Sequence, residues 1–266
     1  MPEPGDNTLM NEAPISHPYG FGHGLTVVIR LGRDSGGTGI GLSILKLDAG
    51  ETQTIDSQRE TAALLLTGTA VFGYASTQVR VARTSIFNEN PSALHCSGGE
   101  AATIIAESPC EFAIIQTGTG ATFPTSIFTA DALAGVEDCC KGVLEDTAHR
   151  LVRTVFSHRT HPQAGFTLGE VVAFPGSWSG YPPHHHPQAE IQHYRFTRPQ
   201  GYGHAELGST VHKIGNNDTL VVDTGVVHAQ VAAPGYGMYY LWAIRHLPEQ
   251  PYLAPEFVQA HCWAFT

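Results

Sequence analysis

Short apolar runs separated by turn residues recur along almost the whole chain and constrain its fold more than any other feature. Runs such as Ile40–Leu47, Ala102–Ala106 and Met238–Ile244 each have the length of one strand. The 266 residues include 29 Gly and 17 Pro, and only 14% of them are charged. Many short strands at this spacing predict an all-β protein of the sandwich or barrel type and argue against disorder or a coiled coil.

The runs fall into two series with a similar plan. The first extends from about residue 24 to 120, and the second begins near Arg150. Pro91–His95 in the first series is similar to Asp223–His228 in the second, which indicates a weak internal duplication and two like barrels. We therefore predict an arm over 1–22, a first barrel over 23–127, a connector with little regular structure over 128–148 and a second barrel over 149–266.

Three histidines and a glutamate in the second series have the spacing of a metal site. His184 and His186 are two residues apart in a strand-like segment, so their side chains share a face while His185 points away. Glu190 opens the next run, and His228 would come from a later strand that returns beside the first. Three nitrogens and one oxygen suit Zn, Mn, Fe, Co or Ni and leave positions open for water or substrate.

A surface metal-binding tract is the plainer interpretation of these residues, because the chain contains 15 histidines. The agreement of the HxH pair, the carboxylate and the later Gly-x-x-His favours a built site instead. The first series lacks an HxH pair and keeps only Glu60 and His95 near equivalent places. We therefore predict that the first barrel is metal-free and packs against the second.

Composition excludes several classes of function. The net charge is −10 with only 14 Lys+Arg and no basic run, which argues against nucleic-acid binding. No run approaches the ~18 apolar residues of a membrane span, and the start of the chain lacks the pattern of a signal peptide. The 5 cysteines form no disulfide framework or CxxC pair. Their number and spacing favour reduced thiols in a cytoplasmic protein.

The motif residues resemble those of a known superfamily. His184, His186, Glu190, Gly225 and His228 match the two motifs of the cupins. The flanking segments 175–186 and 233–242 are similar to the 5-deoxyglucuronate isomerase family of inositol breakdown, which is related to the 4-deoxy-5-hexosulose-uronate ketol-isomerases. The resemblance implies two cupin (double-stranded β-helix, or jelly-roll) barrels in tandem, with one divalent metal, zinc by preference, on those three histidines and Glu190.

The resemblance also implies an activity and partners. It implies an intramolecular aldose–ketose isomerase acting on a deoxy-uronate, 5-deoxyglucuronate or a close relative, and a homodimer or larger homo-oligomer. The chain departs from the family at several pocket positions: only 187–189 separate the HxH pair from the glutamate, and Gln192, His193, Ala205 and Val227 replace family residues. These departures leave the exact sugar acid open.

An aldose–ketose isomerase must polarise a carbonyl, stabilise an enediolate and move a proton. If Glu190 faces the barrel interior, strand alternation sends Tyr194 inward with it and His193 outward. Tyr194 is therefore our preferred proton carrier. Tyr240, Glu170 and His193 are alternatives.

A uronate also needs a clamp for its carboxylate, and the planar fork of arginine suits this. Arg150 lies where the isomerase family has an arginine, while Arg153 and Arg195 compete for the role. Tyr181, just before the Pro-Pro-His run, is expected at the mouth of the barrel. Two rival functions remain: another sugar-acid or dioxygenase chemistry on the same cage, and a non-catalytic sugar-acid-binding cupin.

Overall fold

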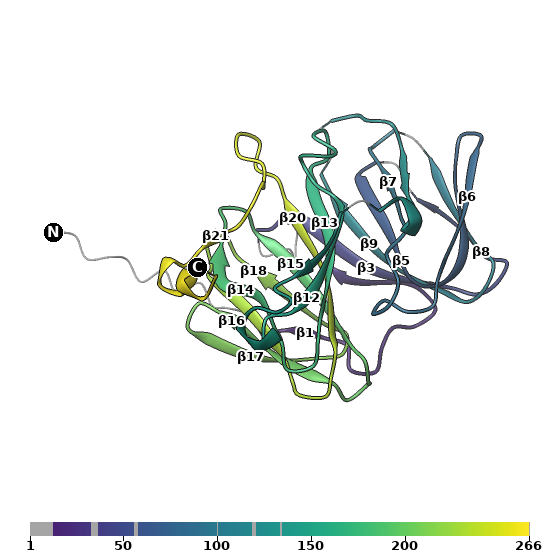
Figure 1. Cartoon of the computed structure of the whole chain (residues 1–266). Coiled ribbons are helices and arrows are strands. Elements are labelled where there is room, and N and C mark those ends of the chain that lie inside the picture. The colour runs from purple at the N-terminus through teal and green to yellow at the C-terminus, as the bar shows by residue number, and fades with distance from the viewer. Residues whose placement is uncertain are drawn as a thin grey trace.

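The computed structural model describes residues 13–32, 37–55, 58–99, 101–118, 121–133 and 135–265. Their strands form two sandwich-like barrels that lie side by side, the first at the right and the second at the left of Figure 1. Within these residues the only helices are the short 3-10 segments η1 Ala130–Ala132, η2 Leu144–Asp146 and η3 Gln259–Phe265. No helix in this part of the chain is long and apolar enough to cross a membrane.

The first barrel consists of an inner and an outer sheet. The inner sheet, in spatial order, is β10 (Ser126–Phe128), β7 (Ala93–Cys96), β5 (Glu60–Tyr74), β9 (Cys110–Thr117), β3 (Ile40–Leu47) and β2 (Gly24–Ile29). The outer sheet contains β4 (Thr52–Ile55), β8 (Ala102–Ala106), the end of β5, and β6 (Thr77–Arg83). The apolar runs Thr61–Leu66 and Ala70–Tyr74, which the sequence alone predicts as two strands, are both part of β5. β5 turns from one sheet into the other near Gly68, where an added Cβ would lie 2.5 Å from the Pro109 carbonyl oxygen.

The second barrel repeats this plan. Its inner sheet has the order β1 (Ile15–Ser16), β18 (Asp218–Val222), β15 (Glu190–Phe196), β20 (Met238–Arg245), β13 (Phe166–Ala173), β12 (Arg150–Phe156) and β11 (Gly135–Cys139). Its outer sheet has the order β17 (Thr210–Gly215), β16 (Tyr202–Leu207), β19 (His228–Ala232), β14 (Trp178–His185) and β21 (Glu256–Phe257). By neighbours and chain order, β4 corresponds to β14, β7 to β18 and β8 to β19.

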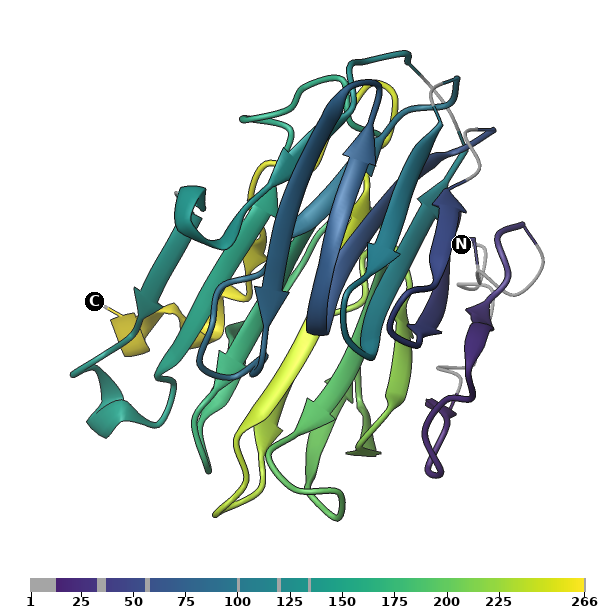
Figure 2. The same cartoon turned by 90° about the vertical axis from the view of Figure 1, so that its right-hand side faces the viewer.

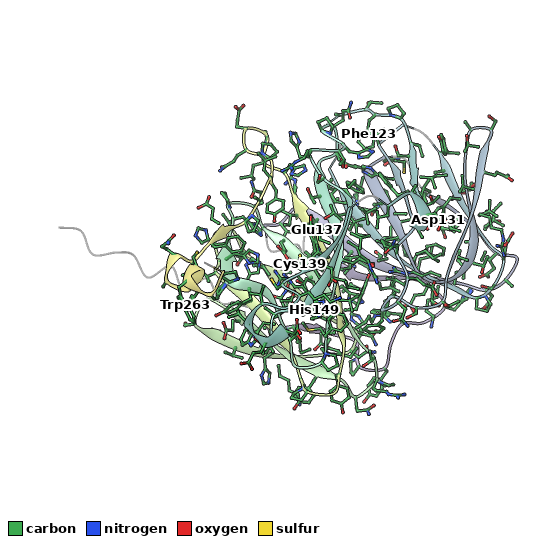
Figure 3. All side chains as sticks on the ribbon, in the orientation of Figure 1. Phe123, Asp131, Glu137, Cys139, His149 and Trp263 are labelled. Carbon is green, nitrogen blue, oxygen red and sulfur yellow. The ribbon has the colours of Figure 1, made fainter. Side chains whose placement is uncertain are left out.

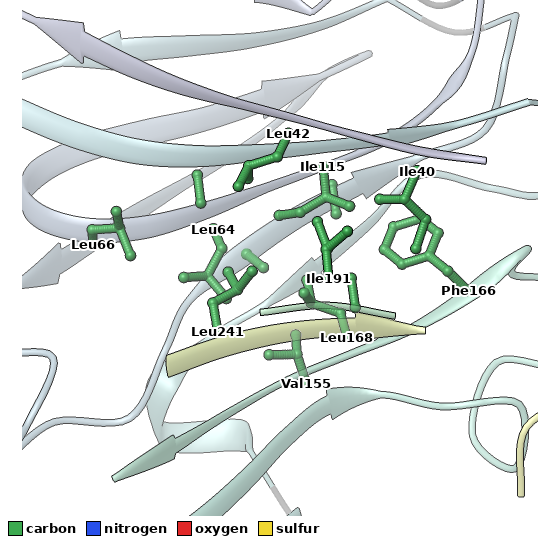
Figure 4. Close-up of a cluster of buried hydrophobic side chains, with 14 of the residues drawn as sticks. Ile40, Leu42, Leu64, Leu66, Ile115, Val155, Phe166, Leu168, Ile191 and Leu241 are labelled. Atoms are coloured by element: carbon green, nitrogen blue, oxygen red, sulfur yellow. The ribbon is translucent and has the colours of Figure 1, made fainter. Parts of the chain in front are cut away.

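The largest hydrophobic core lies between the barrels. Figure 2 shows the strands of the first barrel in front of those of the second, and Figure 4 shows the side chains between them. Leu42 and Ile115 from the first barrel share this core with Leu168 and Leu241 from the second. β3 has apolar residues on both of its faces, because Leu42 faces this core while Leu45 faces the interior of the first barrel. The two barrels are therefore packed as one body.

The segments outside the two barrels have more structure than the sequence indicated. The predicted arm is described from residue 13, and within it Ile15 pairs with Thr219 at the edge of the second barrel. Residues 1–12 of the arm lie outside the described part. The predicted connector 128–148 contains β11, which pairs with β12. This strand escaped prediction because its middle residues 136–138 are all exposed and leave no apolar alternation to recognise.

Candidate metal centre and its cavity

Neighbouring strands bring the predicted ligands together. β14 pairs with β19 so that His184 lies opposite His228, and His186 directly follows β14. Glu190 opens β15 in the facing sheet. Gly180, at φ +64°, sits where β14 is irregular, and an added Cβ there would lie 3.2 Å from Cε1 of His184. Glycine at this position therefore makes room for the first ligand ring.

Backbone carbonyl oxygens orient the three imidazoles with their Nε2 atoms toward one another. One ring nitrogen from each of His184, His186 and His228 lies within 4.8 Å of the others. The Nδ1 atoms lie 2.9 Å from Gly180 O, 2.7 Å from Gln188 O and 2.9 Å from Val226 O, respectively. A carbonyl oxygen can only accept a hydrogen bond, so each Nδ1 carries the hydrogen. In the neutral form of each imidazole the lone pair is therefore on Nε2, as in metal-bound histidines.

Glu190 completes the cage. Its Oε2 lies 3.0 Å from Nε2 of His186 and 3.7 Å from Nε2 of His228. Within the described part of the chain, Nε2 of His228 is buried without a hydrogen-bond partner. A buried lone pair that faces a carboxylate and two further imidazoles is poorly satisfied by the protein alone. This donor set therefore fits a divalent cation.

The charges of the cage also suit a cation. Burial raises the pKa of Glu190, but His186 and His228 outweigh it and lower that pKa to about 2. Burial, with the nearby His228, lowers the pKa of His184 to about 4. Burial likewise lowers the pKa of His228. At neutral pH the site thus presents an ionised carboxylate and two neutral imidazoles, the protonation states that bind metal.

A chain of hydrogen bonds supports the carboxylate from behind. Gln192 donates its side-chain N–H to Oε1 of Glu190, and the hydroxyl of Tyr194 donates to Oε1 of Gln192. Tyr194 is fully buried, so it reaches the cage only through Gln192. Tyr240 lies closer to open space, and its hydroxyl is 2.7 Å from Oγ of Ser179. Of the two tyrosines, Tyr240 is the one at the cavity beside the cage.

That cavity has a volume of about 150 Å³. It is lined by Arg150, Val152, Val171, Gly180, His184, Glu190, Gln192, Gln230, Tyr240, Trp242, Ile244, Tyr252, Pro255 and Phe257. The size fits a small molecule rather than the drug-sized ligands of larger pockets. Two of the four cage residues, His184 and Glu190, line this cavity directly.

Of the three candidate arginines, the structure places Arg150 at the cavity. Its Nη1 donates to Ala148 O at 2.9 Å, and its Nη2 donates to Tyr181 O at 3.3 Å. The buried Arg153 instead contacts Oε1 of Glu170 at 2.9 Å, beneath the first barrel. Arg195 reaches the first barrel, where Nη2 contacts Oε1 of Glu111 at 2.6 Å. Arg153, Arg195 and Glu170 thus join the barrels and lie away from the cage.

Tyr181 differs in detail from its expected place, whereas His193 agrees with it. The side chain of Tyr181 faces a neighbouring hollow, which it lines with Trp178 and Leu144, while its carbonyl holds Arg150. His193 points outward, as strand alternation predicts. Its Nδ1 is 2.8 Å from Oγ1 of Thr219, and its Nε2 accepts from Arg195. Of these two residues, Tyr181 affects the cavity by holding Arg150 with its carbonyl oxygen.

The C-terminal tail contributes residues that the sequence did not reveal. Tyr252, Pro255 and Phe257 line the cavity, yet they follow the last barrel strand, β20, and carry no periodic pattern. Gln230 and Trp242 were likewise missed as lining residues. Their places on β19 and β20 would have been recognisable only with the strand pairing known.

The first barrel differs from the sequence interpretation at His95. His95 is on β7, which corresponds to β18, so it is not the counterpart of His228 on β19. It faces the second barrel, stacks on Phe156 at 4.1 Å and contacts Oε1 of Glu60 at 2.9 Å. Glu60 in turn accepts a hydrogen bond from Gly165 N at 2.9 Å. This pair joins the barrels, in line with the structural role expected for the first one.

Comparison with known proteins identifies the family. The model of the KduI/IolB family matches residues 17–264. The chain belongs to this family. It is 25% identical over 256 residues to a 5-deoxy-glucuronate isomerase of Geobacillus thermodenitrificans, covering 85% of this chain and 90% of that protein. A 5-deoxy-glucuronate isomerase of Shouchella clausii is also 25% identical, over 60% of this chain and 62% of that protein. The names of these relatives support an isomerase.

Solved structures confirm the all-β cupin-like fold. An IolB-like protein from Salmonella typhimurium aligns with a TM-score of 0.76 at 23% identity, covering 85% of this chain and 90% of its own. A cupin conserved barrel domain protein from Leptotrichia buccalis aligns with a TM-score of 0.51 at 10% identity, covering 83% of this chain and 88% of its own. The barrels of the present chain are open sandwiches rather than closed sheets.

Proposed function

We propose that this protein is a metal-dependent aldose–ketose isomerase of a deoxy-uronate, either 5-deoxyglucuronate or a close relative. The observation that carries the proposal is a cage of three imidazoles and Glu190, with Nε2 of His228 lacking a hydrogen-bond partner among the described residues. This cage adjoins a small cavity whose wall also contains Arg150. The names of the family relatives support the same reaction class and substrate.

His184, His186, Glu190 and His228 are the proposed metal ligands. A divalent ion held there, zinc by preference, would act as a Lewis acid on the carbonyl and hydroxyl oxygens of the substrate. The backbone carbonyls behind the three rings fix their orientation. Gln192 does the same for Glu190, with Tyr194 as a positioning residue one step further back.

Arg150 is the proposed partner of the substrate carboxylate. Its contacts with Cys140 Sγ, Ala148 O and Tyr181 O use three of the five N–H groups of a guanidinium. The remaining groups can form charge-assisted hydrogen bonds with a carboxylate. An overall negative protein repels anions in general, so a single placed cation at the cavity gives orientation as well as affinity.

Tyr240 replaces Tyr194 as the proposed residue that exchanges a proton with a substrate oxygen. It lines the cavity, and burial raises its pKa to about 12 although Ser179 and Arg150 oppose this. Its hydroxyl is therefore protonated at neutral pH and can donate to an oxygen that becomes negative during enolisation. Oγ of Ser179, 2.7 Å away, orients that hydroxyl.

The function is tested with purified protein and a panel of 5-deoxy- and 4-deoxy-uronates. We expect interconversion of the aldose and ketose forms of at least one of them, loss of turnover on chelation and recovery when a divalent ion is added. If metal-loaded protein leaves every sugar acid of the panel unchanged, the isomerase proposal is wrong. Binding without turnover would then favour a non-catalytic sugar-acid-binding protein, and oxygen consumption with iron would favour an oxygenase.

Two variants test which tyrosine exchanges the proton with the substrate. Tyr240→Phe should lower kcat by about 100-fold or more, as expected when a general acid is lost, with little change in KM. Tyr194→Phe should have a smaller effect, because it only loosens the hydrogen bond behind Glu190. Equal kcat values for Tyr240→Phe and the unmodified protein would contradict the role of Tyr240.

A further inference from the structure

The C-terminal tail, residues 246–265, is anchored on β14, the strand that carries His184. Phe257 in β21 pairs with His184 in β14, and Val258 N donates to Pro183 O at 2.9 Å. The side chain of Gln188, between two proposed ligands, donates to Gln250 O at 2.7 Å. Figure 3 shows Trp263, near the end of the tail, at the end of the molecule away from the first barrel. The tail therefore has a defined position beside the cage.

Aromatic rings of the tail lie against the ligand rings. The Tyr252 ring is 5.1 Å from that of His186, and the Phe257 ring is 6.0 Å from that of His184, both edge to face. Tyr252 also meets Trp242 of β20 at 6.5 Å. Phe257 is 48% exposed, so the tail forms one wall of the cavity from beside the cage to its rim.

The two sources of lining residues differ in chemistry. The barrel supplies all the charged and amide groups, namely Arg150, Glu190, Gln192 and Gln230, together with apolar side chains such as Val152, Val171 and Ile244. The tail supplies Tyr252, Pro255 and Phe257, and among these described lining residues the hydroxyl of Tyr252 is the one polar side-chain group. A substrate that lies between these walls finds its charged and amide partners on the barrel side, while its edge toward Pro255 and Phe257 meets apolar side chains.

We propose that this tail wall determines substrate specificity by favouring a sugar acid whose carbon at the wall lacks a hydroxyl group. This inference rests on the proposed function, in which the cage takes the carbonyl end and Arg150 takes the carboxylate. A hydroxyl group pressed against Pro255 and Phe257 would lose its water without gaining a partner there, which is unfavourable. An apolar pocket of this kind discriminates against an added hydroxyl by roughly 100-fold.

The experiment compares kcat/KM for a deoxy-uronate with kcat/KM for the uronate that carries the missing hydroxyl. For the unmodified protein we expect a preference of roughly 100-fold for the deoxy substrate. Phe257→Ser and Pro255→Ser each place a hydroxyl group on the wall and should lower this preference by about tenfold, chiefly by reducing kcat/KM for the deoxy substrate. Metal content should be unchanged in both variants, because neither residue is a proposed ligand.

Leu253→Ser is the matched control, because Leu253 belongs to the same tail but is 61% exposed and lies outside the lining. It should leave the substrate preference unchanged. If Phe257→Ser and Pro255→Ser fold, bind metal and keep the full preference, the tail does not select the substrate and this inference is wrong while the proposed function stands. If the unmodified protein isomerises no deoxy-uronate, the proposed function fails and this inference fails with it.

Discussion

The two barrels have the same strand order, but at one pair of corresponding strands the second barrel has buried polar side chains where the first has apolar ones. In the second barrel β14 and β19 bring His184 opposite His228. In the first barrel the corresponding strands β4 and β8 bring Ile55 opposite Ala102. Ile55 and Ala102 belong to the apolar core of their barrel. The fold therefore does not need polar groups there, and the buried ligands of the second barrel are explained by function rather than by folding.

The buried Glu–His pairs of the two barrels show the same contrast. Glu60 and His95 in the first barrel are satisfied by each other, by Gly165 N and by a stacked phenyl ring. In the second barrel Nε2 of His228 has no hydrogen-bond partner among the described residues, although Glu190 is 3.7 Å away. One pair is complete in the protein alone, whereas the donor set around His228 fits a cation. The following changes should separate these two roles.

The largest effect is expected from the proposed ligands. His186→Ala or His228→Ala should lower turnover by about 100-fold or more, because the loss of a residue that only supports a metal ligand already costs roughly 10- to 100-fold. The reason is that each change removes one donor of four. His185→Ala is the matched control, since His185 points away from the cage. A normal rate in His186→Ala, or a metal-free protein in His185→Ala, would overturn the register of the cage.

The interface pair of the first barrel should affect stability instead of metal binding. His95→Ala leaves Glu60 buried beside apolar rings and should lower the free energy of unfolding by about 3 kcal/mol. Denaturant unfolding of metal-loaded protein measures this. Metal content and KM should stay at the values of the unmodified protein. Loss of the metal in His95→Ala without loss of stability would mean that the first barrel has a metal site after all.

Arg150→Ala should chiefly weaken substrate binding. Removing charge-assisted hydrogen bonds worth about 1.5–3 kcal/mol should raise KM roughly 10- to 100-fold, with a smaller change in kcat. Arg195→Ala is a useful comparison, because Arg195 pairs with Glu111 of the other barrel. It should reduce stability and leave KM unchanged. An unchanged KM in Arg150→Ala would remove this residue from the substrate site.

The smallest effect concerns pH and the docking of the tail. Nδ1 of His246 accepts a hydrogen bond from Tyr252 N at 3.0 Å, so the docked tail requires neutral His246. Burial, together with the neighbouring His158, lowers the pKa of His246 from 6.5 to about 4. Its contribution to tail docking is complete above pH 6.5. It declines as the pH falls toward 4, because the undocked tail binds the proton first.

Hydrogen exchange of the Tyr252 amide as a function of pH measures this effect. We expect protection to decrease between pH 6.5 and 4 in the unmodified protein and to decrease less in His246→Gln, which keeps an acceptor but does not titrate. The same decrease in both proteins would show that His246 is not responsible.

Sequence patterns predicted those strands that are buried and therefore consist of an apolar run. β3 and β8 were placed at their observed bounds, because each has an apolar run ended by turn residues. β11 and β21 were missed, because they are short edge strands with mostly exposed side chains. The His184–Glu190 part of the cage was recognisable because the end of β14, the short turn after it and the first residue of β15 supply three of the ligands within seven consecutive residues.

The rest of the site depends on contacts that local patterns do not contain. Tyr252 and Phe257 reach the cavity because the tail folds back onto β14. The similar local runs suggest that His95 corresponds to His228. The strand pairing instead gives Ala102, which lies opposite Ile55, as the counterpart of His228. Tyr194 was assigned the correct side of β15, but only the structure shows Gln192 between it and Glu190.

Metal content per chain tests the central claim most directly. Elemental analysis of the unmodified protein, His186→Ala and His95→Ala, purified side by side without chelator, compares the two barrels in one measurement. We expect one divalent ion per chain in the unmodified protein and in His95→Ala, and little in His186→Ala. Equal metal content in all three proteins, or loss of the ion from His95→Ala instead of His186→Ala, would contradict a metal cage confined to the second barrel.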